Sequence, residues 1–139
     1  MKKLQIMTVV FFMLFAGTSV FAQGFKPAFD ITGIWRSQDP GTAQQYQNGI
    51  EVRSIYINRG FSHFLTGTYI NATTIKGIQY RNNRSNGCLT VMAITINVHS
   101  PDSLSGEWEA MDSNCDLRSG QKGSWKSQRD HKLEQSTWY

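Results

Sequence analysis

Histidine, serine and acidic residues are all present, but their spacing forms no known catalytic arrangement. His63, His99 and His131 lie far apart, and none belongs to an H-x-H or H-E-x-x-H pattern. No Gly-x-Ser-x-Gly elbow accompanies the serines. Glu107 and Glu109 stand two positions apart, so they share one face of a strand, and we expect that face to point to solvent. The sequence therefore predicts a protein that is not an enzyme, with no catalytic residue, no metal and no cofactor.

The most donor-rich segment of the chain runs from 81 to 87. Arg81 and Arg84 flank two asparagines, and Ser-Asn-Gly follows. Arginine forks bind carboxylate or phosphate groups, so this segment could contact an anionic or carbohydrate ligand. The alternative is a solvated hairpin loop at one end of the domain. Of these two interpretations, we favour the solvated loop.

The two cysteines predict one structural disulfide. Cys88 and Cys115 share no C-x-x-C spacing with each other or with a histidine, which argues against zinc. Two cysteines in an exported domain most simply pair with each other.

Residues 1–22 have the three parts of a cleavable signal peptide. Lys2 and Lys3 precede a short apolar run, and Val20-Phe21-Ala22 ends it with an A-x-A-like site. The run is shorter than the ~20 residues that a bilayer requires. Cleavage leaves 117 of the 139 residues and lowers the formal charge from +4 to +2. We therefore expect a periplasmic or secreted protein that has no membrane span after cleavage and does not bind nucleic acid.

The remaining chain alternates between short β-type segments and turn signals. Asp39-Pro40-Gly41, Asn48-Gly49 and Arg59-Gly60 are typical turn sequences, and Asn48-Gly49 predicts a two-residue hairpin. The expected strands are 31–36, 42–47, 50–57, 61–70, 74–82, 88–99, 103–111 and 121–129. Eight evenly spaced strands favour an all-β, antiparallel up-and-down barrel, with a β-sandwich as the alternative. The predicted organisation is an extended lead (23–30), one barrel domain (31–129) and a polar tail without a helix (130–139).

The hairpin between the cysteines has two possible registers. A two-residue loop places Cys88 opposite Cys115 but sets Ile94 and Ile96 against glutamates. A three-residue loop instead aligns Ile94 with Trp108. Burial of one apolar face normally decides register, so we expect the second, with a bulge near 113–114 that restores the cysteines to bonding distance.

The first strand carries a motif that resembles calycins, the superfamily of avidins and lipocalins. Gly33-Ile34-Trp35 is similar to the Gly-x-Trp with which those barrels begin, and Leu65-Thr66-Gly67-Thr68-Tyr69 is similar to an avidin strand. The resemblance implies that Trp35 closes one barrel end and that Arg129 stacks over it. It further implies Tyr69 as a ligand-binding residue, with Trp108 in an aromatic box, Arg81 near the rim and Ser37 after the first strand.

Other parts of the avidin pattern are missing. The stretch after Trp35 lacks the asparagine and Gly-Ser that contact biotin, so biotin is not the expected ligand. The sequence favours the simpler interpretation, in which Trp35, Tyr69, Trp108 and Trp125 fill a small core and its rims.

Two functions follow as hypotheses. The first is an exported, non-catalytic binding protein of the bacterial envelope that uses barrel-end loops to contact a protein partner. Inward Met92, Ile94, Ile96 and Val98 favour it, because they predict a packed interior. The alternative is a calycin-like carrier of a small ligand at the open end of the barrel. The sequence does not define the oligomeric state, and the resemblance permits a monomer or a tetramer.

Overall fold

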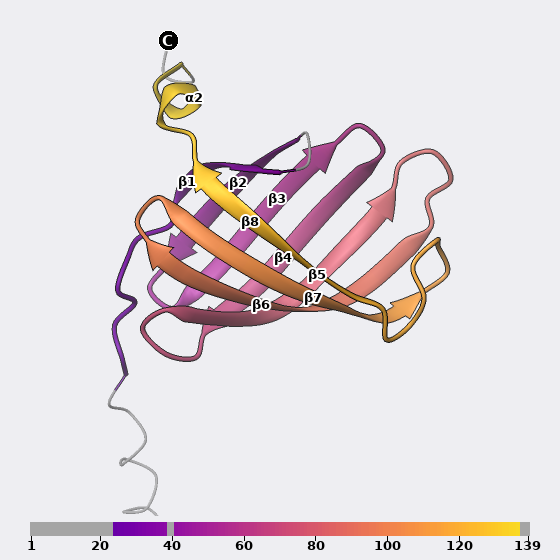
Figure 1. The fold of residues 1–139 in the computed structure, drawn as a ribbon, viewed down its shortest axis with the longest axis horizontal. Coiled ribbons are helices and arrows are strands. Elements are labelled where there is room, and N and C mark those ends of the chain that lie inside the picture. The colour runs from indigo at the N-terminus through magenta and orange to yellow at the C-terminus, as the bar shows by residue number, and fades with distance from the viewer. Residues whose placement is uncertain (1–23, 39–40, 137–139) are drawn as a thin grey trace, which may run out of the picture.

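Eight antiparallel strands form a closed barrel (Figure 1). The computed structural model describes residues 24–38 and 41–136, so the predicted signal peptide lies outside it. Each strand pairs with its neighbour in sequence, and β8 returns to pair with β1. The strands are β1 (Gly33–Ser37), β2 (Gly41–Asn48), β3 (Glu51–Asn58), β4 (Phe61–Tyr69), β5 (Thr74–Asn83), β6 (Leu89–Ser100), β7 (Ser103–Ser113) and β8 (Lys122–Arg129). The predicted up-and-down barrel is confirmed, and the alternative of an open sandwich is wrong.

A short helix, α2 (His131–Ser136), follows the last strand, where we expected a tail without a helix. The Asp130 carboxylate caps it by accepting a hydrogen bond from the Leu133 N–H at 3.0 Å. A helix of six residues is too short to show apolar periodicity, which is why the sequence pattern did not reveal it. Among the residues that the structure describes, no helix is long and apolar enough to cross a membrane.

The β6–β7 hairpin has the register that burial predicted. Ile94 lies opposite Trp108, and the same alignment pairs Met92 with Ala110 and Val98 with Leu104. The apolar residues of both strands therefore face the interior, while Glu107 and Glu109 face solvent.

The turn of this hairpin differs from the prediction. Ser100 pairs with Ser103, so the loop has two residues, and an irregularity at His99 shifts the register behind it. A second irregularity at Met111 shifts it back, two positions before the expected bulge. Both predicted registers therefore occur in one hairpin. The middle has the register that aligns the apolar pairs, and the two ends have the register that places the cysteines opposite each other, with a bulge at each change of register.

The predicted disulfide joins Cys88 to Cys115, with 5.4 Å between their Cα atoms. Cys88 lies just before β6 and Cys115 just after β7, so the bond closes the hairpin opposite its turn. It also holds the start of the long β7–β8 loop.

The β2–β3 turn is displaced by one residue from the expected Asn48-Gly49. Asn48 pairs with Glu51, which leaves Gly49 and Ile50 as the loop. Gly49 has a φ of 59°, and no described residue other than glycine has a positive φ. One positive φ at the first loop position suits a type II′ turn, whereas Asn-Gly in a type I′ turn needs two.

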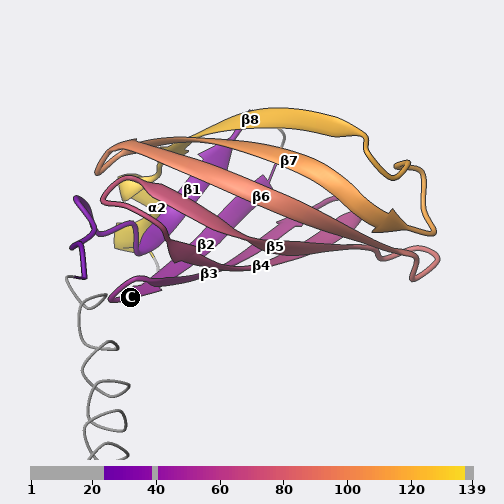
Figure 2. The same ribbon diagram turned by 90° about the horizontal axis from the view of Figure 1, so that it is seen from below.

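One end of the barrel is plugged. Trp35 and Ile31 are fully buried there, and the Trp35 indole N–H donates to the Ile31 carbonyl at 2.9 Å. The lead before β1 crosses this end, and its Ala28 N–H donates to the Ala72 carbonyl in the β4–β5 turn at 2.7 Å. Figure 2 shows the lead and α2 at this closed end, with the β5–β6 and β7–β8 loops at the other.

Steric crowding at the closed end explains the glycine of the Gly-x-Trp motif. A Cβ on Gly33 would lie 2.0 Å from the Glu134 carboxylate and 2.9 Å from the Arg129 guanidinium. Arg129 pairs with Trp35 across the β1–β8 ladder. Its guanidinium contacts Glu134 at 3.0 Å and donates to the backbone carbonyls of Asp30 and Thr32. Gly33 therefore leaves the space in which this ion pair ties α2 and the lead to the barrel.

Candidate functional site

The interior is hollow toward the end of the barrel that carries the disulfide. A cavity of about 330 Å³ lies there, and every strand contributes to its wall. Its apolar wall includes Leu65, Met92, Ile96, Leu104, Trp108 and Trp125. The expectation of a packed interior is wrong for this half, although all four predicted inward residues, Met92, Ile94, Ile96 and Val98, belong to the buried core. A volume of this size is at the lower end of the range for small-molecule sites.

Two cross-strand tryptophan–glycine pairs shape the β7–β8 side of the cavity. Trp125 lies over Gly106 and Trp108 lies over Gly123. A Cβ would come within 2.1 Å of the Trp125 ring at Gly106, and within 2.4 Å of the Trp108 ring at Gly123. Because the glycines have no side chains, both indoles lie close against the barrel wall.

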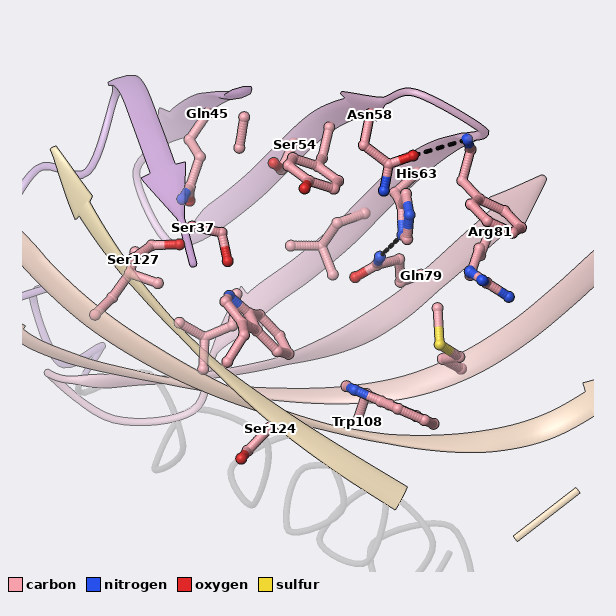
Figure 3. A pocket seen from close by; sticks show the side chains of 18 of the residues that line it. Ser37, Gln45, Ser54, Asn58, His63, Gln79, Arg81, Trp108, Ser124 and Ser127 are labelled. Atoms are coloured by element: carbon pink, nitrogen blue, oxygen red, sulfur yellow. Dashed lines mark hydrogen bonds between the residues drawn. The ribbon is translucent and has the colours of Figure 1, made fainter. Parts of the chain in front are cut away.

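Uncharged polar side chains from β1, β2, β3 and β8 also line the cavity. Ser37 pairs with Ser127 across β1 and β8, and Gln45 pairs with Ser54 across β2 and β3. Gln45 is 6% exposed and extends into the interior (Figure 3). Within the described part of the chain, its amide oxygen is buried and has no hydrogen-bond partner. This part of the cavity wall thus offers neutral hydrogen-bonding groups.

An aromatic and cationic cluster from β3, β4 and β5 lines the cavity near the loops. The Tyr56 and His63 rings meet edge to face, with centroids 5.1 Å apart. The Gln79 amide nitrogen lies 2.5 Å from His63 Nδ1. The Arg81 guanidinium carbon sits 3.5 Å from the centroid of the Phe61 ring. Three neighbouring strands therefore hold these side chains through mutual contacts (Figure 3).

Arg81 also binds the β7–β8 loop. Its guanidinium lies 2.8 Å from the Asp116 carboxylate, and this hydrogen bond lowers the pKa of that carboxyl below its ordinary value. Leu117, the next residue, lines the cavity. The ion pair and the disulfide at Cys115 thus fix the loop beside the cavity from two adjacent positions.

The structure brings together three of the four residues proposed as ligand-binding. Ser37, Arg81 and Trp108 all line the cavity. Tyr69 is instead buried at the closed end, and its hydroxyl lies 3.5 Å from the Phe29 carbonyl. Burial and the nearby Asp30 charge raise the pKa of Tyr69 to about 12. Tyr69 therefore belongs to the plug and not to the cavity.

Sequence reasoning missed Gln45, Ser54, His63 and Gln79, all of which line the cavity. In β3 the inward position is Ser54, while the neighbouring Ile55 is 46% exposed on the outer surface. In β5 the inward Gln79 likewise follows the exposed Ile78. The sequence did carry a signal for these residues, because polar and aliphatic residues alternate on consecutive strands. That alternation identifies the lining residues only if the polar side chains, and not the aliphatic ones, are assumed to point into the barrel.

Comparison with known proteins gives no relative: no family model, curated protein or solved structure matches this chain. The class of protein is therefore defined by its fold alone, a closed eight-stranded antiparallel barrel with one disulfide.

Proposed function

We propose that this protein is an exported, calycin-like binding protein that carries a small ligand in its barrel without transforming it. One observation carries the proposal, the cavity of about 330 Å³ with aromatic and polar walls inside a barrel plugged at the other end. A rigid apolar enclosure with a few converging polar groups is typical of ligand sites. Ser37, Arg81, Trp108 and Trp125 are the residues that we assign to ligand contact.

Two features support export. The sequence of residues 1–22 has the parts of a secretory signal, and the Cys88–Cys115 disulfide is of the kind that persists in oxidising compartments. Together they support the periplasm or the outside of the cell as the location of the proposed carrier.

Native mass spectrometry of the mature protein purified from its own envelope tests the proposal. We expect a bound small molecule that is released on unfolding, and a rise in melting temperature when that molecule is added back. Recovery of a protein partner with an empty barrel would instead support the other hypothesis, in which the barrel-end loops bind a protein.

A matched pair of variants on β3 locates the site. Ser54 lines the cavity, and Ile55 beside it faces outward. Ser54→Phe should fill the cavity and abolish ligand retention, whereas Ile55→Phe should retain the ligand at the wild-type level. Circular dichroism checks folding, and the smaller Ser54→Leu serves if the phenylalanine variant does not fold. Equal retention by the cavity-filling and the outer-face variants would refute the interior site.

A further inference from the structure

We infer that the cavity selects a flat, uncharged ligand bearing a carboxamide group, and that the Gln45 amide is its anchor. This inference rests on the proposed function and specifies the chemical class of its ligand. It follows from three features of the cavity wall: its charge, its buried amide and its indoles.

Among the described lining residues, the cavity offers no unpaired fixed charge to a charged ligand. Arg81 carries the only fixed charge among the described lining residues, and it is already bound to Asp116 at 2.8 Å. Its guanidinium is also stacked on Phe61. An anion would have to displace Asp116, and a cation would find no carboxylate among the described lining residues and would meet the Arg81 cation. Burying a charge without a partner is costly, so the wall favours a neutral ligand.

Gln45 supplies the specific contact. Its Oε1 is buried, faces the interior and has no donor within the described part of the chain. A buried acceptor without a donor weakens the folded state, and a ligand N–H would satisfy it. A ligand carbonyl could in turn accept a hydrogen bond from the Gln45 amide nitrogen. A carboxamide has both groups on one planar unit.

The indoles supply the flat surface. Trp108 and Trp125 line one wall, held against it by Gly123 and Gly106. Neither indole N–H donates to an acceptor in the described part of the chain, so both remain available to a ligand carbonyl. Aromatic surfaces of this kind favour planar ligands, which stack or meet them edge to face.

Four small molecules that share a benzene ring and differ in its substituent test this inference on the mature protein: benzamide, benzoate, benzamidinium and toluene. Isothermal titration or NMR titration gives each affinity. We expect benzamide to bind about tenfold more tightly than the two ions, because its hydrogen bonds are satisfied without burying a charge. Benzoate or benzamidinium binding as tightly as benzamide would overturn the inference and leave the proposed cavity intact.

Neighbouring glutamines on β2 give the matched variants. Gln45 lines the cavity, and the adjacent Gln44 pairs with the outward Ile55. Gln45→Leu should weaken benzamide about tenfold while toluene binds as before, and Gln44→Leu should change neither. Unchanged benzamide affinity in the Gln45 variant would refute the anchor. Failure of all four probes to bind the wild-type protein would refute the inference, whereas the proposed function is refuted only by an empty barrel in the native mass spectrometry described above.

Discussion

At the scale of single residues, the glycines opposite tryptophans have the clearest role. Gly106 and Gly123 allow Trp125 and Trp108 to lie against the β7–β8 wall, which gives the cavity its aromatic surface. Neither glycine needs an unusual φ, so their role is to leave space for the rings. The packing of the two indoles against these glycines therefore determines the shape of the cavity wall.

Replacing Gly106 with alanine should displace the Trp125 ring, because the new Cβ would lie 2.1 Å from it. We expect a loss of about 1–3 kcal/mol in the free energy of unfolding, as for other overpacked sites. Urea denaturation followed by tryptophan fluorescence measures it. The control is Gly60→Ala in the β3–β4 turn, where nothing lies within 4 Å. Equal stability of the Gly106 and Gly60 variants would contradict this account of the glycines.

The Glu134 carboxyl makes the closed end sensitive to acid. Burial alone would raise the pKa of Glu134, but the Ile34 N–H and the Arg129 guanidinium outweigh it and hold that pKa below its ordinary value. Because the folded-state pKa lies below that of the unfolded chain, Glu134 adds stability at pH values above about 4.3. This stability is lost as the pH falls through the folded-state pKa.

Glu134→Gln should therefore lower the melting temperature by roughly 5 °C at neutral pH and by less at about pH 3, which lies below the ordinary pKa of the carboxyl. Differential scanning calorimetry at both pH values measures this. Glu109→Gln is the control, since its ion pair with Lys122 is largely exposed and contributes little at any pH. A loss that is the same at both pH values would argue against an ionised Glu134 as the cause.

At the scale of strands and hairpins, alternation predicted β6 and β7 because one face is apolar and the other polar. That contrast fixed the pairing of Ile94 with Trp108, and the structure confirms it. In β3 the exposed side carries Ile55 and Ile57, while the interior receives Ser54 and Tyr56. Hydrophobicity therefore indicates the wrong inward face for β3, because this strand lines the polar part of the cavity. The barrel was therefore predictable, whereas Gln45, Ser54 and the cavity itself were not.

Because the apolar contacts set the register, we expect the β6–β7 hairpin to survive without its disulfide. Changing Cys88 and Cys115 together to alanine removes a cross-link between residues 27 positions apart. The variant should keep the wild-type circular dichroism spectrum and lose about 3 kcal/mol of unfolding free energy, mainly through a less constrained unfolded chain. Urea denaturation of the oxidised wild-type protein and the variant gives the difference. Loss of the β-sheet spectrum in water would show that the bond is needed to set the register.

At the scale of the whole molecule, the barrel divides into a plugged end and a hollow end. Trp35, Ile31 and the Arg129–Glu134 pair fill the first. The disulfide and the Arg81–Asp116 pair hold the loop beside the second. This division lets a domain of modest size keep a packed core and still enclose a ligand-sized space.

We predict that the mature protein begins at Gln23, because cleavage after Ala22 fits the small-residue rule for signal peptides. Intact-mass spectrometry of the exported protein measures this, with reducing and non-reducing conditions to report the disulfide. A chain that retains residues 1–22 would contradict the assignment of a cleavable signal.

The central claim, that the hollow half of the barrel holds a ligand, is tested most directly by the indole N–H signals of the tryptophans in ¹⁵N-edited NMR spectra. Trp108 and Trp125 line the cavity, whereas the Trp35 indole is buried in the plug and bonded to Ile31. Titration with a ligand that raises the melting temperature should shift the Trp108 and Trp125 signals and leave that of Trp35 in place. Unchanged Trp108 and Trp125 signals at saturation would show that the ligand binds elsewhere and would contradict the account.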